Sequence, residues 1–207
     1  MKTIKVKLTL TESLLGTAST NKEIHREFIA SKAPDASTIK EEVAAIGAEA
    51  VADKSMTVFP RDAQGRVFVY DYQIKGFLKE ACRVQARIPG TVVNKTKAYI
   101  KIVDGLVFVY PRRILLDISN GVDDEGRPSP VISILERPLR AQTAQGERIA
   151  LASSEQAPAG TTLDVEFKLL DDDCEKLLLE LLNYGQFKGL GQWRNASHGR
   201  FAWKLIE

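Results

Sequence analysis

The first ten residues alternate between apolar and polar side chains, and this pattern constrains the fold more than any other feature of the sequence. Every second residue from Ile4 to Leu10 is apolar, whereas lysine and threonine occupy the positions between them. Because successive side chains of a β-strand point to opposite sides, such a strand buries one face and leaves the other open. Residues 162–169 and 201–206 alternate in a similar way. These strands are typical of an antiparallel sheet that is covered on one face.

Two segments between these strands have the periodicity of amphipathic helices. Apolar residues recur at intervals of three and four in residues 71–83 and again in residues 171–184. The segment from residue 17 to residue 55 is rich in alanine and glutamate, and we predict helices at 21–31 and 38–50 within it. We interpret this segment as a helical insertion that packs on the main sheet.

Turn-forming residues predict two β-hairpins in the middle of the chain. One pairs residues 56–59 with residues 66–70 across a loop that contains proline, aspartate and glycine. The other pairs residues 99–103 with residues 106–110 across an Asp-Gly dipeptide, which favours a two-residue hairpin turn. Later segments are predicted as an apolar run at 114–118, a loop at 119–130 and strands at 131–135 and 147–152.

The order of these elements predicts an α+β fold, with residues 1–207 forming a single domain. Strands with one helix in each half of the chain fit a βαββαβ unit, to which the hairpins and the helical insertion are added. An antiparallel sheet with an open face beside basic loops is a recurrent platform for single-stranded RNA.

Composition fits a globular protein and argues against several classes of function. Hydrophobic residues make up 44% of the 207 residues and charged residues 27%, so the chain can bury a sizeable core. No apolar run is long enough to span a bilayer, and the N-terminal segment lacks the apolar core of a signal peptide. We therefore expect no membrane partner and a cytoplasmic location. Cys82 and Cys174 are predicted to be buried thiols, and we expect no metal and no cofactor.

Positive charge is concentrated in the middle of the chain. The net charge is only +2, but residues 74–113 contain nine lysines and arginines and two acids. This distribution fits an anionic partner on one face of the molecule, and an ordinary solvated surface is the alternative.

Residues 189–201, GLGQWRNASHGRF, combine three glycines with two arginines, a histidine and a tryptophan. Such a turn can bring backbone N–H groups and cationic side chains around a phosphate. The alternative is a surface turn that joins a helix to the last strand. A second candidate anion site is the start of the helix at 71–83, where Gly76 lies between Lys75 and Lys79.

Three stretches of the sequence resemble the RAMP superfamily of CRISPR-associated proteins. LTLTESLLGT is similar to the family's first strand and the glycine turn that follows it. DYQIKGFLKEACR, residues 71–83, resembles the segment that reads IPGSSLKGALR in that family. The stretch at 189–201 is similar to the family's glycine-rich loop, with Gly189, Leu190, Gly191 and Gly199 in matching positions and Ser197 where a glycine is usual. The three stretches also follow the family's order.

The resemblance implies a ferredoxin-like (RRM-like) core and a protein that binds CRISPR RNA. A helix of the type at residues 71–83 is more typical of the backbone subunits, which bind the RNA along its phosphates and assemble with copies of themselves or with other effector subunits. Two alternatives remain open. One is a metal-independent endoribonuclease of the RAMP type, and the other is a stand-alone relative, of a phage or an orphan locus, that acts as a protein-interaction module.

Candidate site residues follow from these patterns. The residues predicted to bind RNA are Lys75, Gly76, Lys79, Arg83, Lys188, Gly189, Gly191, Trp193, Arg194, His198, Gly199 and Arg200. An endoribonuclease would need a general base, for which histidine is the usual residue. The resemblance to the RAMP superfamily also implies that a backbone subunit can cut target RNA with an aspartate in an early loop. The candidates for these catalytic roles are His25, His198, Asp35 and Asp53.

Overall fold

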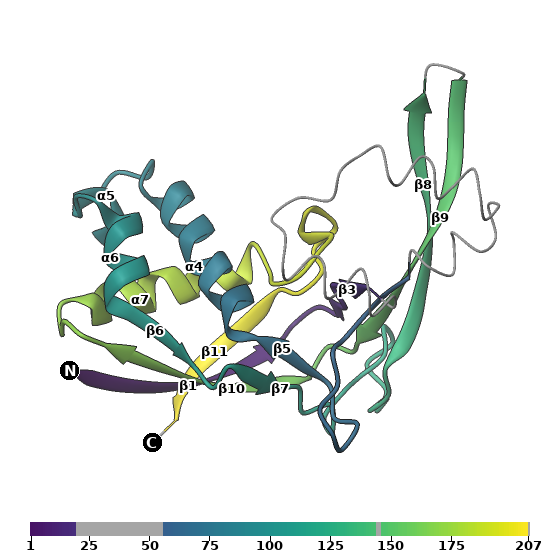
Figure 1. Cartoon of the computed structure of the whole chain (residues 1–207), viewed down its shortest axis with the longest axis horizontal. Coiled ribbons are helices and arrows are strands. Elements are labelled where there is room, and N and C mark those ends of the chain that lie inside the picture. The colour runs from purple at the N-terminus through teal and green to yellow at the C-terminus, as the bar shows by residue number, and fades with distance from the viewer. Residues whose placement is uncertain (20–55, 144–145, 207) are drawn as a thin grey trace.

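A four-stranded antiparallel sheet with helices on one face forms the centre of the protein (Figure 1). The structure is a computed structural model, and it describes residues 1–19, 56–143 and 146–206. The strands of this sheet are β1 (Lys2–Leu10), β6 (Val107–Tyr110), β10 (Thr162–Leu169) and β11 (Phe201–Ile206), in the order β11-β1-β10-β6. Helices α4 (Asp71–Gln85) and α7 (Cys174–Asn183) complete a βαββαβ unit along the chain. This order of strands and helices is that of a ferredoxin-like core, so the predicted fold class is confirmed.

The core lies between the sheet and its helices, and the alternation in the sequence produces it. Val6 and Leu8 of β1 are fully buried and pair with Val165 and Leu163 of β10. On the helix side, α4 and α7 contribute their apolar stripes to the same cluster, and both cysteines are buried there as free thiols. Burial raises the pKa of the Cys82 thiol to about 12. Each fully buried aliphatic side chain stabilises the fold by about 1.5–3 kcal/mol.

Two further groups of strands extend this core. β5 (Phe68–Tyr70) pairs with β7 (Arg113–Leu115) in a two-stranded sheet. β8 (Ser133–Thr143) and β9 (Gly146–Ala157) form a long antiparallel hairpin that projects from one end of the molecule (Figure 1). The short strands at the base of this hairpin are β2 (Leu14–Leu15), β3 (Ala18–Ser19) and β4 (Thr57–Val58). Both strands of the hairpin run longer than the predicted 131–135 and 147–152.

The hairpin predicted at residues 99–110 is wrong. Tyr99–Leu106 forms helix α6, after a four-residue helix α5 (Val92–Lys95), and only Val107–Tyr110 is a strand. The apolar residues of α6 recur at intervals of three and four, and they pack against the core, with Val103 fully buried. This tertiary packing outweighs the turn preference of the Asp-Gly dipeptide.

The hairpin predicted from residues 56–59 and 66–70 is also wrong. β4 pairs antiparallel with β3 and parallel with β9, whereas β5 pairs with β7 in another sheet. A single bridge between Arg61 and Val67 is what the described structure retains of the expected pairing. The predicted helices at 21–31 and 38–50 lie outside the described residues. No helix in the described ranges is both long and apolar enough to cross a membrane.

Candidate nucleic-acid interface at the glycine-rich loop

The two ends of the glycine-rich loop, residues 188–200, are in direct backbone contact. Gly189 is buried, and a Cβ atom placed on it would lie 2.0 Å from the carbonyl carbon of Gly199. The Leu190 N–H donates to the Gly199 oxygen at 2.9 Å, and the Gly199 N–H donates to the Ser13 oxygen at 2.8 Å. Glycine is therefore required at both positions, and the loop is fixed to the chain that leaves β1.

Left-handed backbone shapes the loop between Gly191 and Gly199. Gly191 and Gly199 have φ of 73° and 74°, but Trp193 and Ser197 also have positive φ, at 56° and 72°. Such values are uncommon for residues other than glycine and persist only where the surroundings enforce them. Trp193 and Ser197 flank the 3₁₀ turn η2 (Arg194–Ala196). The positive φ of Ser197 also explains why a glycine suits this position better.

Gln192 ties the loop to the second sheet. Its Nε2 donates to the Gly16 oxygen at 2.6 Å and lies 2.7 Å from Thr57 Oγ1 and 3.1 Å from Ser154 Oγ. The two hydroxyls are themselves hydrogen-bonded at 2.7 Å. Since β4 and β9 supply these hydroxyls, the loop is held between the core and the base of the β8–β9 hairpin. No pattern in the sequence indicates this role for Gln192.

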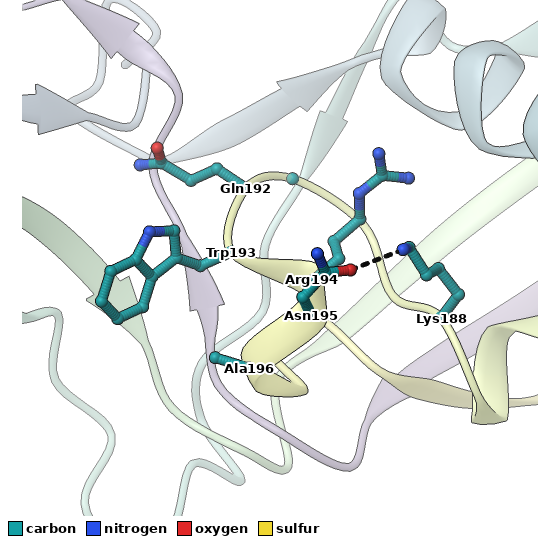
Figure 2. Close-up of a pocket in the computed structure, with 7 residues that line it drawn as sticks. Lys188, Gln192, Trp193, Arg194, Asn195 and Ala196 are labelled. Carbon is teal, nitrogen blue, oxygen red and sulfur yellow. Dashed lines mark hydrogen bonds between the residues drawn. The ribbon is translucent and has the colours of Figure 1, made fainter. Parts of the chain in front are cut away.

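Lys188 and Arg194 are among the residues that line a hollow of about 500 Å³ at the loop (Figure 2). Arg194 donates to the Glu80 carboxylate of α4, and Lys188 Nζ lies 3.9 Å from the other oxygen of that carboxylate. Lys188 also donates to Asn195 Oδ1 at 2.8 Å. One carboxylate therefore faces two cations, and the group keeps one net positive charge that favours an anion.

Arg200 adds a third cation beside the loop. Its Nε donates to the Phe187 carbonyl at 3.2 Å, and no ion pair involves it in the part of the chain that the structure describes. The rest of its guanidinium therefore keeps donors for another acceptor. Arg83 is exposed on α4 one turn beyond Glu80, so it lies on the helix face that meets the loop.

The lysines at the start of α4 contact the end of helix α6 and not the glycine-rich loop. Lys75 donates to the carbonyls of Val103 and Val107 and, at 3.3 Å, to that of Asp104, at the end of α6. Lys79 pairs with the Asp104 carboxylate at 2.6 Å. Burial lowers the pKa of Lys75. The structure thus joins both lysines to α6 and does not bring them to the glycine-rich loop; Gly76, between them, is exposed, with open space around it.

His198 faces the chain that follows β1. Its Nδ1 lies 3.1 Å from Ser13 Oγ and 3.3 Å from the Ser13 carbonyl oxygen, so this nitrogen helps to hold the loop. The other catalytic candidates, His25, Asp35 and Asp53, lie outside the described residues. Among residues 1–19, 56–143 and 146–206, no three His, Cys, Asp or Glu side chains are grouped as metal ligands.

One residue that the sequence did not single out also contacts the loop. Arg137 of β8 is 6% exposed, and its guanidinium lies 3.4 Å from the centre of the Trp193 ring. The two residues are far apart in the sequence, so only the folded chain reveals the pair.

Comparison with known proteins gives a structural likeness. No protein-family model matches the sequence, and no curated protein matches it at a significant level. The fold is similar to that of a chain in the type III-B Cmr-beta complex bound to cognate target RNA, with a TM-score of 0.52 and 11% identity. That match covers 99% of this chain but 60% of the other, so this protein spans less than two thirds of that relative.

A second likeness is to a chain of a type IV-B CRISPR complex. It has a TM-score of 0.53 and 13% identity, and it covers 99% of this chain and 90% of that one. Identities this low show a common fold alone. The ferredoxin-like fold of this protein is therefore one that it shares with chains of two CRISPR complexes.

Proposed function

We propose that this protein is an RNA-binding subunit of a CRISPR-type effector complex and that the glycine-rich loop grips the phosphate backbone of a single-stranded RNA. The observation that carries this proposal is the loop itself. It is a backbone-closed turn that holds Lys188 and Arg194 at one carboxylate, that of Glu80, with Arg200 beside them. A fixed cluster with excess positive charge suits phosphate, which needs charge and N–H donors but no base-specific contact.

The fold supports the same reading. The two similar chains belong to a complex bound to target RNA and to a CRISPR complex, respectively. Two of the three stretches that carry the resemblance in the sequence are the loop and α4, which meet at Glu80. Assembly along an RNA, with copies of this chain or with other subunits, is the finer part of the proposal.

Fluorescence anisotropy with a labelled single-stranded RNA tests the proposal. The full chain carrying Arg194→Ala and Arg200→Ala should bind about 10- to 100-fold more weakly than the wild type at low salt. The slope of log K against log salt should also become shallower by about 1.4, because two phosphate contacts are lost and each is worth about 0.7 on a single strand.

A matched double variant controls for the loss of two charges. Arg66 and Arg127 are exposed arginines that each pair with the aspartate four residues earlier, and none of their ion pairs in the described structure involves the glycine-rich loop. Arg66→Ala with Arg127→Ala should leave the salt slope unchanged. Wild-type protein that binds no RNA, or a loop variant whose affinity and slope equal those of this control, would overturn the proposal.

A further inference from the structure

Arg137 is buried in a way that costs stability. Its side chain is 6% exposed, and its Nε and Nη1 atoms have no hydrogen-bond partner among the described residues. Burial lowers the pKa of this guanidinium. A buried cation with two unpartnered nitrogens is unfavourable, and an apolar residue of similar volume often serves stability better. A charge is therefore kept at this position for a reason other than the stability of the isolated chain.

The contact of Arg137 with Trp193 indicates what that reason is. The guanidinium lies 3.4 Å from the ring centre, so it covers one face of the indole in a cation–π contact. Trp193 is held with φ of 56°, which is a strained value for a bulky residue. Two costly features thus meet in one pair, and strain of this kind is typically found at ligand sites.

Part of the indole is accessible to solvent. Trp193 remains 37% exposed although Arg137 covers one of its faces, and its ring lies tilted to His198 at 6.2 Å. Figure 2 shows the indole on one side of the loop and the Arg194 and Lys188 side chains on the other. A single strand that crosses the loop would meet the cations with its phosphates and the indole with a base.

We propose that Trp193, backed by Arg137, is a stacking site for one nucleobase of the single strand. This inference rests on the proposed RNA-binding function. Stacking on an aromatic ring tolerates any base, so the site adds affinity without reading sequence. The Arg137 guanidinium lies on one face of the indole, and the base would stack on the opposite face. Its positive charge attracts the phosphate next to that base, because salt screens a buried charge only weakly.

The test compares two oligomers of equal length, an oligoadenylate and a ribose-phosphate strand that lacks bases. Trp193→Leu in the full chain should weaken binding of the oligoadenylate about 5- to 100-fold and leave binding of the strand without bases unchanged. For the Trp193→Leu variant, the slope of log K against log salt should equal that of the wild type, because no phosphate contact is lost. The chain has two tryptophans, so oligoadenylate should quench Trp193 emission in the wild type and lose this effect in the variant.

The Arg137→Met variant tests whether Arg137 contributes to RNA binding or only to the stability of the fold. The variant should unfold at the same temperature as the wild type or at a higher one, and yet bind oligoadenylate several-fold more weakly. Trp193→Phe, which keeps an aromatic ring, should restore most of the affinity lost in Trp193→Leu.

The two proposals fail in different ways. Wild-type protein that binds neither oligomer contradicts the RNA-binding function. Wild-type protein that binds both oligomers equally, with no quenching and with equal affinity in Trp193→Leu, keeps that function and overturns the stacking site. An Arg137→Met variant that unfolds earlier and binds normally overturns the role given to Arg137.

Discussion

Backbone conformation at single residues decides the shape of the candidate site. The loop places four residues in left-handed conformations, and only two of them are glycines. At Gly199 the requirement is double, because φ is 74° and a Cβ atom would lie 2.2 Å from the Leu190 oxygen. Removing this freedom would open the loop at its base and displace the cations that it carries.

We therefore expect Gly199→Ala to lower the free energy of unfolding by about 2–4 kcal/mol, from backbone strain and from overpacking against Leu190. RNA affinity should fall with it. Gly105, near the end of α6, is the matched control, because a Cβ atom there meets nothing within 4 Å. Gly105→Ala should change stability by less than about 1 kcal/mol. Equal denaturant midpoints for the two variants would contradict this account of the loop.

At the scale of elements, α6 shows how neighbouring segments decide secondary structure. Its C-terminal carbonyls accept from the Lys75 ammonium of α4, which satisfies groups that a helix end leaves open. The lysine that the sequence pattern offered as a phosphate contact is thus engaged inside the protein. If Lys75 caps α6, its removal should lower stability, whereas if it binds RNA, its removal should change RNA binding.

Lys75→Met should reduce the free energy of unfolding by about 1–3 kcal/mol, because the carbonyls at the end of α6 lose a charged donor. The salt slope of RNA binding should not change. Lys97→Met, at an exposed position, is the control and should leave stability unaltered. If Lys75 gripped a phosphate instead, the slope would fall by about 0.7 and stability would stay the same.

Local pattern predicted the strands and helices with a clear periodicity, including β10, β11 and α7, and it failed where strand pairing was inferred from turn residues. β1 and α4 follow from alternation and from three- and four-residue spacing, and both were predicted within two residues of their bounds. The segments at 56–70 and 99–110 were assigned from turn residues, but β4, β5 and α6 are set by β9, β7 and the core. Pairing between segments that are distant in the sequence cannot be read from a short stretch of residues.

The same distinction applies to the site. The glycines predicted a tight turn or a close approach of the backbone, and the structure has this close approach between Gly189 and Gly199. Arg137 and Gln192 carried no local signal, since their partners lie on segments distant in the sequence. Whether the predicted residues bind RNA stays a prediction.

At the scale of the whole molecule, the open face of the sheet differs from a base-stacking platform. The outward residues of the central strands β1 and β10 are lysines, threonines and acids, and Lys7 pairs with Asp164 at 3.1 Å. Aromatic rings, which stack bases on RRM sheets, are absent from these outward positions of β1 and β10. Exposed Phe108 and Tyr110 lie on the edge strand β6. We therefore expect RNA to contact the end of the sheet where the glycine-rich loop lies.

Photo-cross-linking followed by mass spectrometry can locate the bound RNA on the protein. The full chain would be bound to a single-stranded RNA that contains 4-thiouridine, irradiated and digested. The account predicts cross-links within residues 188–200, with Trp193 and its neighbours among the modified positions. They should be lost in Gly199→Ala and kept in Gly105→Ala. Cross-links confined to the outward residues of β1 and β10, with none in the loop, would contradict it.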